Sequence, residues 1–521
     1  MLFCWRDVLS YVFRKSDRIG NLDAESDSFL DECFVKSDIY NELLEFDKTH
    51  PSFGRRIIVG RTGSGKTALL KQLVRDQTIK DNDEIEAETT IFEHINNNVF
   101  ISDLVREGVD LRAFYKSLWM HVLLVKVIKL LYKDVDGFFE SIGNAFHGKR
   151  RGSLQKAREY VDLHSENFFN SEIVTEITNR FSNELSGCVK LGVVGGSSEA
   201  ADENVKKIQS TTTSYVSSEL LVKQKELIRF ICDDADDVTQ KRIIISVDDL
   251  DKSWLSQSNV RYDFINALLE TFKEFINVRS VKILISIRSD ILQGVYNHNL
   301  RQEEKDSSFI SAIEWQRHEI REILDRRIEA LIRKQYEARA TVSFSDIFNF
   351  QVNGQLADEF ILDRTMLRPR DAIDFVNLCL SNADGKVALT EGDVLEAEQG
   401  YYHSRKKALS DEWRSIYGFI DDYINSISLI RNQSFTVDSL QETGCAESII
   451  DFLIDKTGHA KDLEIEKIAM DIYEIIKLWF RIGVIGYKVG TRLIYSSYRQ
   501  PQLDITDFAK EFVIHPLFYR Y

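Results

Sequence analysis

Apolar residues occur along this chain in short blocks that predict buried strands and in longer stretches with helical spacing. Ile57–Val59 leads into a glycine-rich segment, Ile243–Val247 leads into two aspartates, and a third block covers Val281–Leu292. Such short, bounded apolar runs predict fully buried strands, and the helical stretches between them predict parallel strands joined by crossover helices. The predicted fold class is therefore α/β.

The rest of the pattern is mainly helical and divides the chain into four segments. They are a polar lead-in, an α/β core with a helical insertion at about 96–237, a helical segment, and a C-terminal domain that ends in a hairpin pattern. Their predicted bounds are 1–50, 51–305, 306–395 and 396–521. Within the insertion, the stretch Val194–Ser218 is rich in small polar residues and predicts an exposed loop or mobile hairpin.

Composition narrows the class of protein. A chain of 521 residues is too long for one core and is expected to form three or four domains. Its 43% apolar residues are ordinary for a folded soluble protein, and its four prolines favour long helices. The net charge of −16 excludes a global basic footprint for nucleic acid. The six scattered cysteines predict reduced thiols and no zinc site.

Two apolar segments have some features of targeting or membrane segments. The N-terminal stretch contains Arg6 and Asp7 and lacks a small-residue cleavage site, which makes it a poor signal peptide. Leu118–Leu131 is shorter than the roughly 20 residues that a membrane span needs, and it contains Lys126 and Lys129. We therefore expect a core helix there, and a soluble, cytoplasmic protein with no membrane contact.

The segment GRTGSGKT matches the phosphate-binding pattern G-x-x-x-x-G-K-[ST] in full, between a predicted strand and a predicted helix. Its glycines let backbone N–H groups and a helix N-terminus face an anion. We expect Lys66 to reach the β- and γ-phosphates of ATP and the Thr67 hydroxyl to ligate Mg²⁺. A glycine-rich turn without a ligand is the alternative. The residues expected to bind ATP or ADP are Gly60, Arg61, Thr62, Gly63, Ser64, Gly65, Lys66, Thr67 and Ala68.

Two acids end the strand pattern Ile243–Val247, where a parallel sheet places ligand-facing residues. Asp248 suits a Mg²⁺ site, which it would contact through water. Asp249 is then placed as the base that orients and deprotonates the attacking water, with Lys66 as its catalytic partner. Acids at a strand end can also be a simple turn signal. Asp251 is as suited to a helix N-cap as to catalysis.

Two arginines could respond to a γ-phosphate. Arg288 ends the third strand pattern, where a cation could sense the γ-phosphate and neutralise charge in the transition state; a surface arginine is the alternative. In LRPRDAIDF, Pro369 occupies a plausible first helical position. If this helix closes over the nucleotide, Arg370 could touch phosphate and Pro369 could pack on the base. The alternative is a helix start with solvated arginines.

Other basic residues leave DNA and oligomer contacts open. The run Lys149–Arg151 is a solvated loop or a nucleic-acid or partner contact. In the C-terminal hairpin, basic residues alternate with tyrosines, which suits phosphate contact and base stacking, but an ordinary hairpin explains it equally well. Arginines after Trp315 could complete a neighbour's site in a homo-oligomer, although pairing with nearby glutamates is the simpler interpretation. These arginines are Arg317, Arg321, Arg326 and Arg327.

Taken together, GRTGSGKT, IIISVDDLD, KILISIRSDI and LRPRDAIDF resemble the STAND and KAP-like branch of P-loop ATPases, which is related to AAA+ proteins. The lead-in IGNLDAESDSFLDECFV and the segment RPRDAIDF more narrowly resemble a bacterial and prophage family that includes FunZ-type phage-exclusion proteins. The resemblance covers most of residues 15–390, and GVIGY with FVIHPLF resembles the end of a winged-helix domain. It implies a P-loop parallel-sheet core with a helical lid and a C-terminal winged-helix-like domain.

The resemblance also implies a nucleotide-switch ATPase, often in defence against phage, with a phage-derived trigger or a partner effector protein. KAP proteins commonly carry inserted transmembrane helices, which this chain lacks by pattern, and many AAA+ enzymes use glutamate where this chain has Asp249. The shorter acid predicts slow turnover. The alternatives are a DNA-acting, initiator-like ATPase and a scaffold that binds nucleotide without significant hydrolysis.

Overall fold

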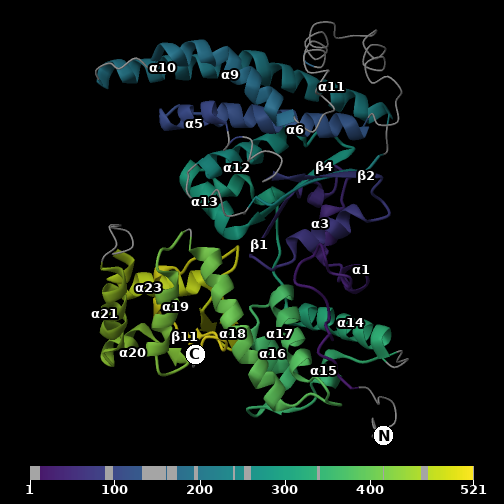
Figure 1. The fold of residues 1–521 in the computed structure, drawn as a ribbon, viewed down its shortest axis with the longest axis vertical. Coiled ribbons are helices and arrows are strands. Elements are labelled where there is room, and N and C mark those ends of the chain that lie inside the picture. Colours follow the sequence, from purple (N-terminus) through teal and green to yellow (C-terminus); the bar gives the residue numbers. More distant parts are fainter. Residues whose placement is uncertain are drawn as a thin grey trace. The chain divides into compact units, whose positions relative to one another are not determined.

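The computed structural model describes residues 12–87, 98–131, 173–192, 198–238, 241–250, 260–336, 341–414, 416–458 and 467–519, together with Ile95 and Tyr160. The chain divides into two compact units (Figure 1). Unit 1 comprises Met1–Val35, Gly60–Ala68 and Ile313–Tyr521, and unit 2 comprises Lys36–Val59 and Leu69–Ala312.

Unit 2 is built on a five-stranded parallel sheet with the strand order β2-β3-β4-β1-β5. The bounds are β1 Ile57–Gly60, β2 Asp81–Glu86, β3 Ile243–Asp248, β4 Val281–Arg288 and β5 Ile310–Ala312. Every residue of β3 is buried, as is typical of parallel strands covered by helices on both faces. The predicted α/β class and the three predicted strands are confirmed, except that β4 ends at Arg288 and the rest of the third block, from Ser289, begins a helix; the arrangement is compatible with a P-loop-like core.

Helices pack around this sheet. The long helices of unit 2 lie beside one another and form a layer (Figure 1). The main helices of the unit are α2 Asp38–Leu43, α3 Lys66–Val74 from Leu69 onward, α5 Val99–Arg106, α6 Arg112–Leu131, α9 Ile173–Gly192, α10 Ser198–Tyr215, α11 Val222–Val238, α12 Val260–Thr271 and α13 Ser289–Asn299. Helix α6 is buried over most of its surface and contacts β2, β3 and α12, so the core helix expected at Leu118–Leu131 is confirmed. None of the helices in the described ranges combines the length and the apolarity that a membrane span requires.

The loop or hairpin expected at Val194–Ser218 is wrong from Ser198 onward, because α10 occupies this region and continues into a π-helical turn, Val216–Leu221. Ile208, Thr212, Val216 and Leu220 are all buried. A spacing of four residues places them on one face of a helix. Serine and threonine between them give this stretch the composition of a loop and conceal the helical period.

A buried lysine joins β4 to the end of α2 in unit 2. Lys282 is 0% exposed, and its ammonium donates to the carbonyl oxygens of Glu45 at 2.8 Å and Glu42 at 3.3 Å. The carbonyl end of a helix attracts a cation. Burial, together with the neighbouring Arg56 guanidinium, nevertheless lowers the pKa of Lys282 to about 6.

We predict that Lys282 makes the stability of the protein depend on pH. Between pH 6 and the ordinary lysine pKa of 10.5, the unfolded chain binds a proton that the folded chain does not, so stability should rise with pH. Thermal unfolding of wild type and Lys282→Met is measured at pH 6, 7, 8 and 9. The melting temperature of the wild type should rise relative to that of the variant as the pH rises. A constant difference between the two proteins would contradict a lowered pKa.

Unit 1 contains a helical part and a C-terminal part with a four-stranded sheet, and both contribute to one apolar core. The helical part consists of α1 Leu30–Cys33, α14 Arg317–Tyr336, α15 Phe344–Ile347, α16 Ala357–Arg364, α17 Pro369–Asn382 and α18 Glu391–Trp413, with the short strands β6 Gln351–Val352 and β7 Gln355–Leu356. Helices α17 and α18 pack against each other (Figure 1). This packing places the start of α17 and the end of α18 in the same unit as residues 60–68.

The C-terminal part follows α18. Its elements are α19 Ile420–Ser426, β8 Ser434–Phe435, α20 Val437–Glu442, α21 Cys445–Thr457, α23 Ile472–Ile482, β9 Ile485–Val489, β10 Arg492–Ile494 and β11 Phe512–Ile514. The strand order is β10-β9-β11-β8, and β9 pairs with β10 in an antiparallel hairpin, which confirms the predicted hairpin. Helix α23 buries most of its residues, and the Trp479 indole N–H donates to the Tyr423 carbonyl at 2.7 Å.

Candidate functional site

Residues Gly60–Thr67, which we call the glycine loop, connect β1 to α3. Gly63 has φ +79° and Gly65 has φ +93°, a backbone region that favours glycine. The Ser64 amide donates to the Arg61 carbonyl at 3.2 Å and closes a turn. The Lys66 ammonium lies against the loop, where it donates to the carbonyls of Gly60 at 3.2 Å and Arg61 at 3.4 Å. Left-handed residues within a turn gather N–H groups into an anion-binding concavity.

The glycine loop also has unused capacity for hydrogen bonding. The hydroxyl oxygens of Thr62 and Ser64 are buried and make no hydrogen bond within the described part of the chain. Buried polar atoms in proteins usually have a partner. A side chain at Gly65 would meet no atom within 4 Å, so the loop is open on that side. Together with the Lys66 ammonium, this donor set fits a ligand rich in phosphate oxygens.

The start of α17, which lies within the motif LRPRDAIDF, contacts the glycine loop. Pro369 is the first residue of the helix, and the Arg370 amide donates to the Gly63 carbonyl at 3.4 Å. A Cβ at Gly63 would lie 3.0 Å from the Cβ of Arg370, so only glycine fits there without adjustment. The Arg370 side chain donates to the Leu22 carbonyl at 3.2 Å. Burial lowers the pKa of Arg370, and the Arg405 guanidinium lowers it further.

Three residues that the sequence hypothesis did not assign to the site also contact the glycine loop. The Trp315 indole N–H donates to the Ser64 carbonyl at 2.8 Å, and Arg368 donates to the Thr62 carbonyl at 3.0 Å. Glu412, at the end of α18, is paired with Arg61 and with Arg368, each at 3.4 Å. Its side chain is only 2% exposed.

Arg61 links the glycine loop to the C-terminal part of unit 1. Its guanidinium donates to the Ile482 carbonyl, at the end of α23, at 2.9 Å. It also lies 5.8 Å from the ring centre of Trp413. A guanidinium at a helix C-terminus is favoured by the helix dipole. Arg61, predicted as a nucleotide-binding residue, therefore uses its side chain for contacts within the protein.

The predicted metal and catalytic acids lie at the end of β3 in unit 2. Asp248 is the last residue of the strand and is 8% exposed. Asp249 follows with φ +59°, a left-handed conformation that aspartate tolerates better than most residues. Strained backbone of this kind is concentrated at functional sites. Asp251, the ambiguous third acid, lies outside the described residues.

Arg288 is the last residue of β4, the neighbour of β3 in the sheet. Because the two strands are parallel, Arg288 and Asp248 stand at the same edge of the sheet. The guanidinium already has a partner, since it makes two hydrogen bonds to the carboxylate of Asp290, at 2.7 and 3.0 Å. This fork-like pairing two residues away was not predicted.

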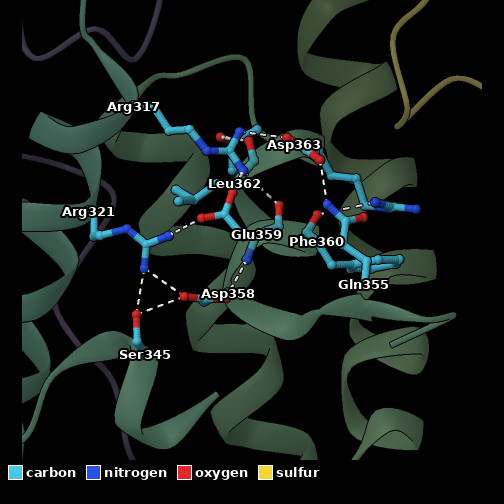
Figure 2. A network of polar contacts seen from close by, with 11 residues as sticks. Arg317, Arg321, Ser345, Gln355, Asp358, Glu359, Phe360, Leu362 and Asp363 are labelled. Atoms are coloured by element: carbon cyan, nitrogen blue, oxygen red, sulfur yellow. Dashed lines mark hydrogen bonds and ion pairs between the residues drawn. The ribbon is translucent and has the colours of Figure 1, made fainter. Parts of the chain in front are cut away.

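The arginines of α14 all have partners in their own chain. Arg317 binds Glu359 and Asp363, and Arg321 binds Glu359 and Asp358, the last at 2.6 Å (Figure 2). The others pair elsewhere, Arg326 with Glu322 at 2.6 Å and Arg327 with Asp27 at 2.7 Å. These contacts support the simpler interpretation, in which the arginines stabilise the helical part of unit 1.

The proposed DNA-contacting residues are mostly engaged within the C-terminal part. Tyr487 is 4% exposed and accepts a hydrogen bond from Gln500 at 2.7 Å, while Tyr495 packs against the ring of His515. Lys488 is paired with Glu511 at 2.6 Å. A tyrosine as buried as Tyr487 cannot stack on a base, which favours an ordinary hairpin at this position. The basic run Lys149–Arg151 lies outside the described residues.

The comparison with protein families concerns the helical part of unit 1. Residues 318–410 match the family model described as the FunZ-associated C-terminal helical domain, a segment that begins in α14 and ends in α18. The match supports a FunZ-type protein. The chain has no match among curated proteins.

Proposed function

We propose that the protein is an ATP-binding switch that hydrolyses ATP slowly with Mg²⁺. The observation that carries this proposal is the glycine loop. It follows a buried parallel strand and contains two left-handed glycines, the Lys66 ammonium, and two buried hydroxyls that have no hydrogen-bond partner among the described residues. Backbone N–H groups at the start of a helix bind phosphate in many proteins.

Each site residue has a role in this proposal. The backbone of Gly60–Ala68 and the Lys66 ammonium hold the phosphates, and Thr67 and Asp248 hold Mg²⁺. Bound Mg²⁺ neutralises charge on the phosphates. Asp249 orients the attacking water and accepts its proton on a carboxylate oxygen. The sheet of unit 2 supports the roles of the acids and of Arg288, because β3 and β4 are parallel neighbours and Asp248 and Arg288 lie at one edge of that sheet.

Switching in this proposal depends on two arginines. Arg370 contacts the glycine loop through its backbone, so a change in the loop displaces the start of α17. Arg288 is paired with the carboxylate of Asp290. It can therefore bind a γ-phosphate only by giving up its contact with Asp290. ATP then favours one arrangement of the chain and hydrolysis restores the other. In this proposal Pro369 packs on the base of the bound ATP.

We further propose that this switch acts in antiviral defence or phage exclusion, in response to a phage-derived trigger or through a partner effector. The match of residues 318–410 to the FunZ-associated domain supports this role. Plaque assays with cells that express the chain would test it across diverse phages. Protection that requires Lys66 would support the proposal, and an absence of protection against every phage would contradict the defence role.

A DNA-acting ATPase is the second candidate function. The net charge of −16, the buried face of α23 and the buried Tyr487 do not favour it. Phosphate release by the purified protein should therefore change little when duplex DNA is added. A several-fold stimulation that falls steeply with salt would instead favour the DNA-acting candidate.

Size-exclusion measurements with and without ATP would show whether nucleotide drives a homo-oligomer.

A further inference from the structure

Donors from the segment of unit 1 that follows β5 bind three successive carbonyl groups of the glycine loop. Arg368 binds the Thr62 carbonyl at 3.0 Å, and Trp315 binds the Ser64 carbonyl at 2.8 Å. Between them, the Arg370 amide approaches the Gly63 carbonyl at 3.4 Å. The two side-chain donors lie 306 and 251 residues away from their acceptors in the sequence.

These contacts fix the direction in which backbone N–H groups point. In a trans peptide, the carbonyl of one residue and the N–H of the next lie in one plane and point in opposite directions. A bond from Trp315 to the Ser64 carbonyl therefore turns the Gly65 N–H away from Trp315. In the same way, a bond from Arg368 to the Thr62 carbonyl turns the Gly63 N–H away from Arg368.

The two peptides held in this way are the ones with the greatest intrinsic freedom. Each precedes a glycine with positive φ, and glycine has the largest conformational entropy in the unfolded or mobile state. An unrestrained glycine loop would sample many directions of its N–H groups, and a ligand would have to order them on binding. External donors on the carbonyls provide that order in advance.

Local structure explains how the two donors are delivered. Arg368 precedes Pro369, which restricts it to an extended backbone, and it has φ −116° and ψ 137° immediately before α17. Glu412 pairs with the same guanidinium, and both side chains are nearly buried. Trp315 lies between β5 and α14, a short connection that limits its reach.

We propose that Trp315 and Arg368 are positioning residues for phosphate binding, because they orient the Gly65 and Gly63 N–H groups toward the ligand. This inference rests on the proposed function, since it assigns the orientation of the ATP-binding backbone. Neither residue touches the phosphates through the bonds described here. They raise the affinity for nucleotide, in addition to any contribution that they make to the stability of the fold.

The decisive variant is Trp315→Phe, which keeps an aromatic ring and removes the N–H donor. One hydrogen bond changes an equilibrium constant by about two- to tenfold, so we expect ATP and ADP to bind about three- to tenfold more weakly. The affinity is measured by titration with a fluorescent ATP analogue and by competition with ADP. The melting temperature is measured in parallel.

Trp479→Phe is the matched control. It removes the same type of bond, from an indole N–H to a main-chain carbonyl, in the C-terminal part of unit 1. We expect it to lower the melting temperature and leave the nucleotide affinity unchanged. Arg368→Met should weaken binding as Trp315→Phe does, and Arg368→Lys, which keeps a charge for Glu412 and a donor for Thr62, should restore part of the affinity.

The outcomes separate this inference from the proposed function. If wild type binds no ATP, the proposed function fails, and the positioning role fails with it. If wild type binds ATP and both Trp315→Phe and Arg368→Met bind it equally well, only the positioning role is overturned. An equal loss of affinity in Trp479→Phe would also overturn it, because the effect would then reflect general destabilisation.

Discussion

Replacing Lys66 with alanine is expected to abolish measurable ATP hydrolysis and to weaken ATP binding by about 100-fold or more, as is typical when a preorganised charge that faces a phosphate is lost. The Lys66 ammonium lies against the glycine loop through the carbonyls of Gly60 and Arg61. Its charge is therefore held at the glycine loop. Nucleotide titration and phosphate release by the purified variant measure both effects.

Lys71→Ala provides the control for this variant, because Lys71 lies on the same helix, α3, beyond the glycine loop. We expect it to bind and hydrolyse ATP as wild type does. In cells that resist phage, Lys66→Ala should lose protection and Lys71→Ala should keep it. Protection that persists in Lys66→Ala would exclude an ATP-dependent mechanism.

The strands were predictable where burial is complete and were missed where it is not. β1, β3 and β4 are buried almost throughout and consist mostly of apolar residues, so their sequence carries a clear signal. β2 has the sequence DNDEIE, in which only Ile85 is buried, because it lies at the edge of the sheet. At the other edge, β5 has only three residues. Edge strands need fewer apolar residues, which leaves little pattern to detect.

In the candidate site too, some residues were predictable from the local sequence, whereas others depend on contacts between distant parts of the chain. The glycine loop was predictable because its function requires particular residue types at fixed spacing. For Arg370 the motif predicted a contact with phosphate, whereas the contact that the structure shows is between its amide and the Gly63 carbonyl. Trp315 and Arg368 were not identified, because they bind main-chain carbonyls and every residue has a carbonyl. A bond to the backbone therefore leaves no partner residue in the sequence to suggest the pair.

Glu412 was missed for a different reason. It lies in α18 among other charged residues, where an acid usually has a solvated position on a helix surface. The structure instead buries it between Arg61 and Arg368. Arg288 shows the opposite case, since the sequence indicated an arginine at a strand end but not its pairing with Asp290. Burial and pairing depend on tertiary contacts that a single sequence does not display.

Asp249→Asn is expected to reduce ATP turnover by about 100-fold or more while ATP binding stays within a few-fold of wild type, in keeping with the usual contribution of a general base. Asparagine is the informative substitution because it tolerates the left-handed backbone at this position, φ +59°, and removes only the ability to accept a proton as a carboxylate. Alanine would add backbone strain. Single-turnover hydrolysis and nucleotide titration separate the two effects.

Asp248→Asn should behave differently from Asp249→Asn, which makes the pair of variants more informative than either alone. If Asp248 holds Mg²⁺, its variant should require a higher Mg²⁺ concentration for hydrolysis, whereas excess Mg²⁺ should not rescue Asp249→Asn. Asp249→Gly, which suits the positive φ equally well, should be as inactive as the asparagine variant and should remain folded. Wild-type turnover in Asp249→Asn would show that Asp249 is not the base. It would then favour a scaffold that binds nucleotide without significant hydrolysis.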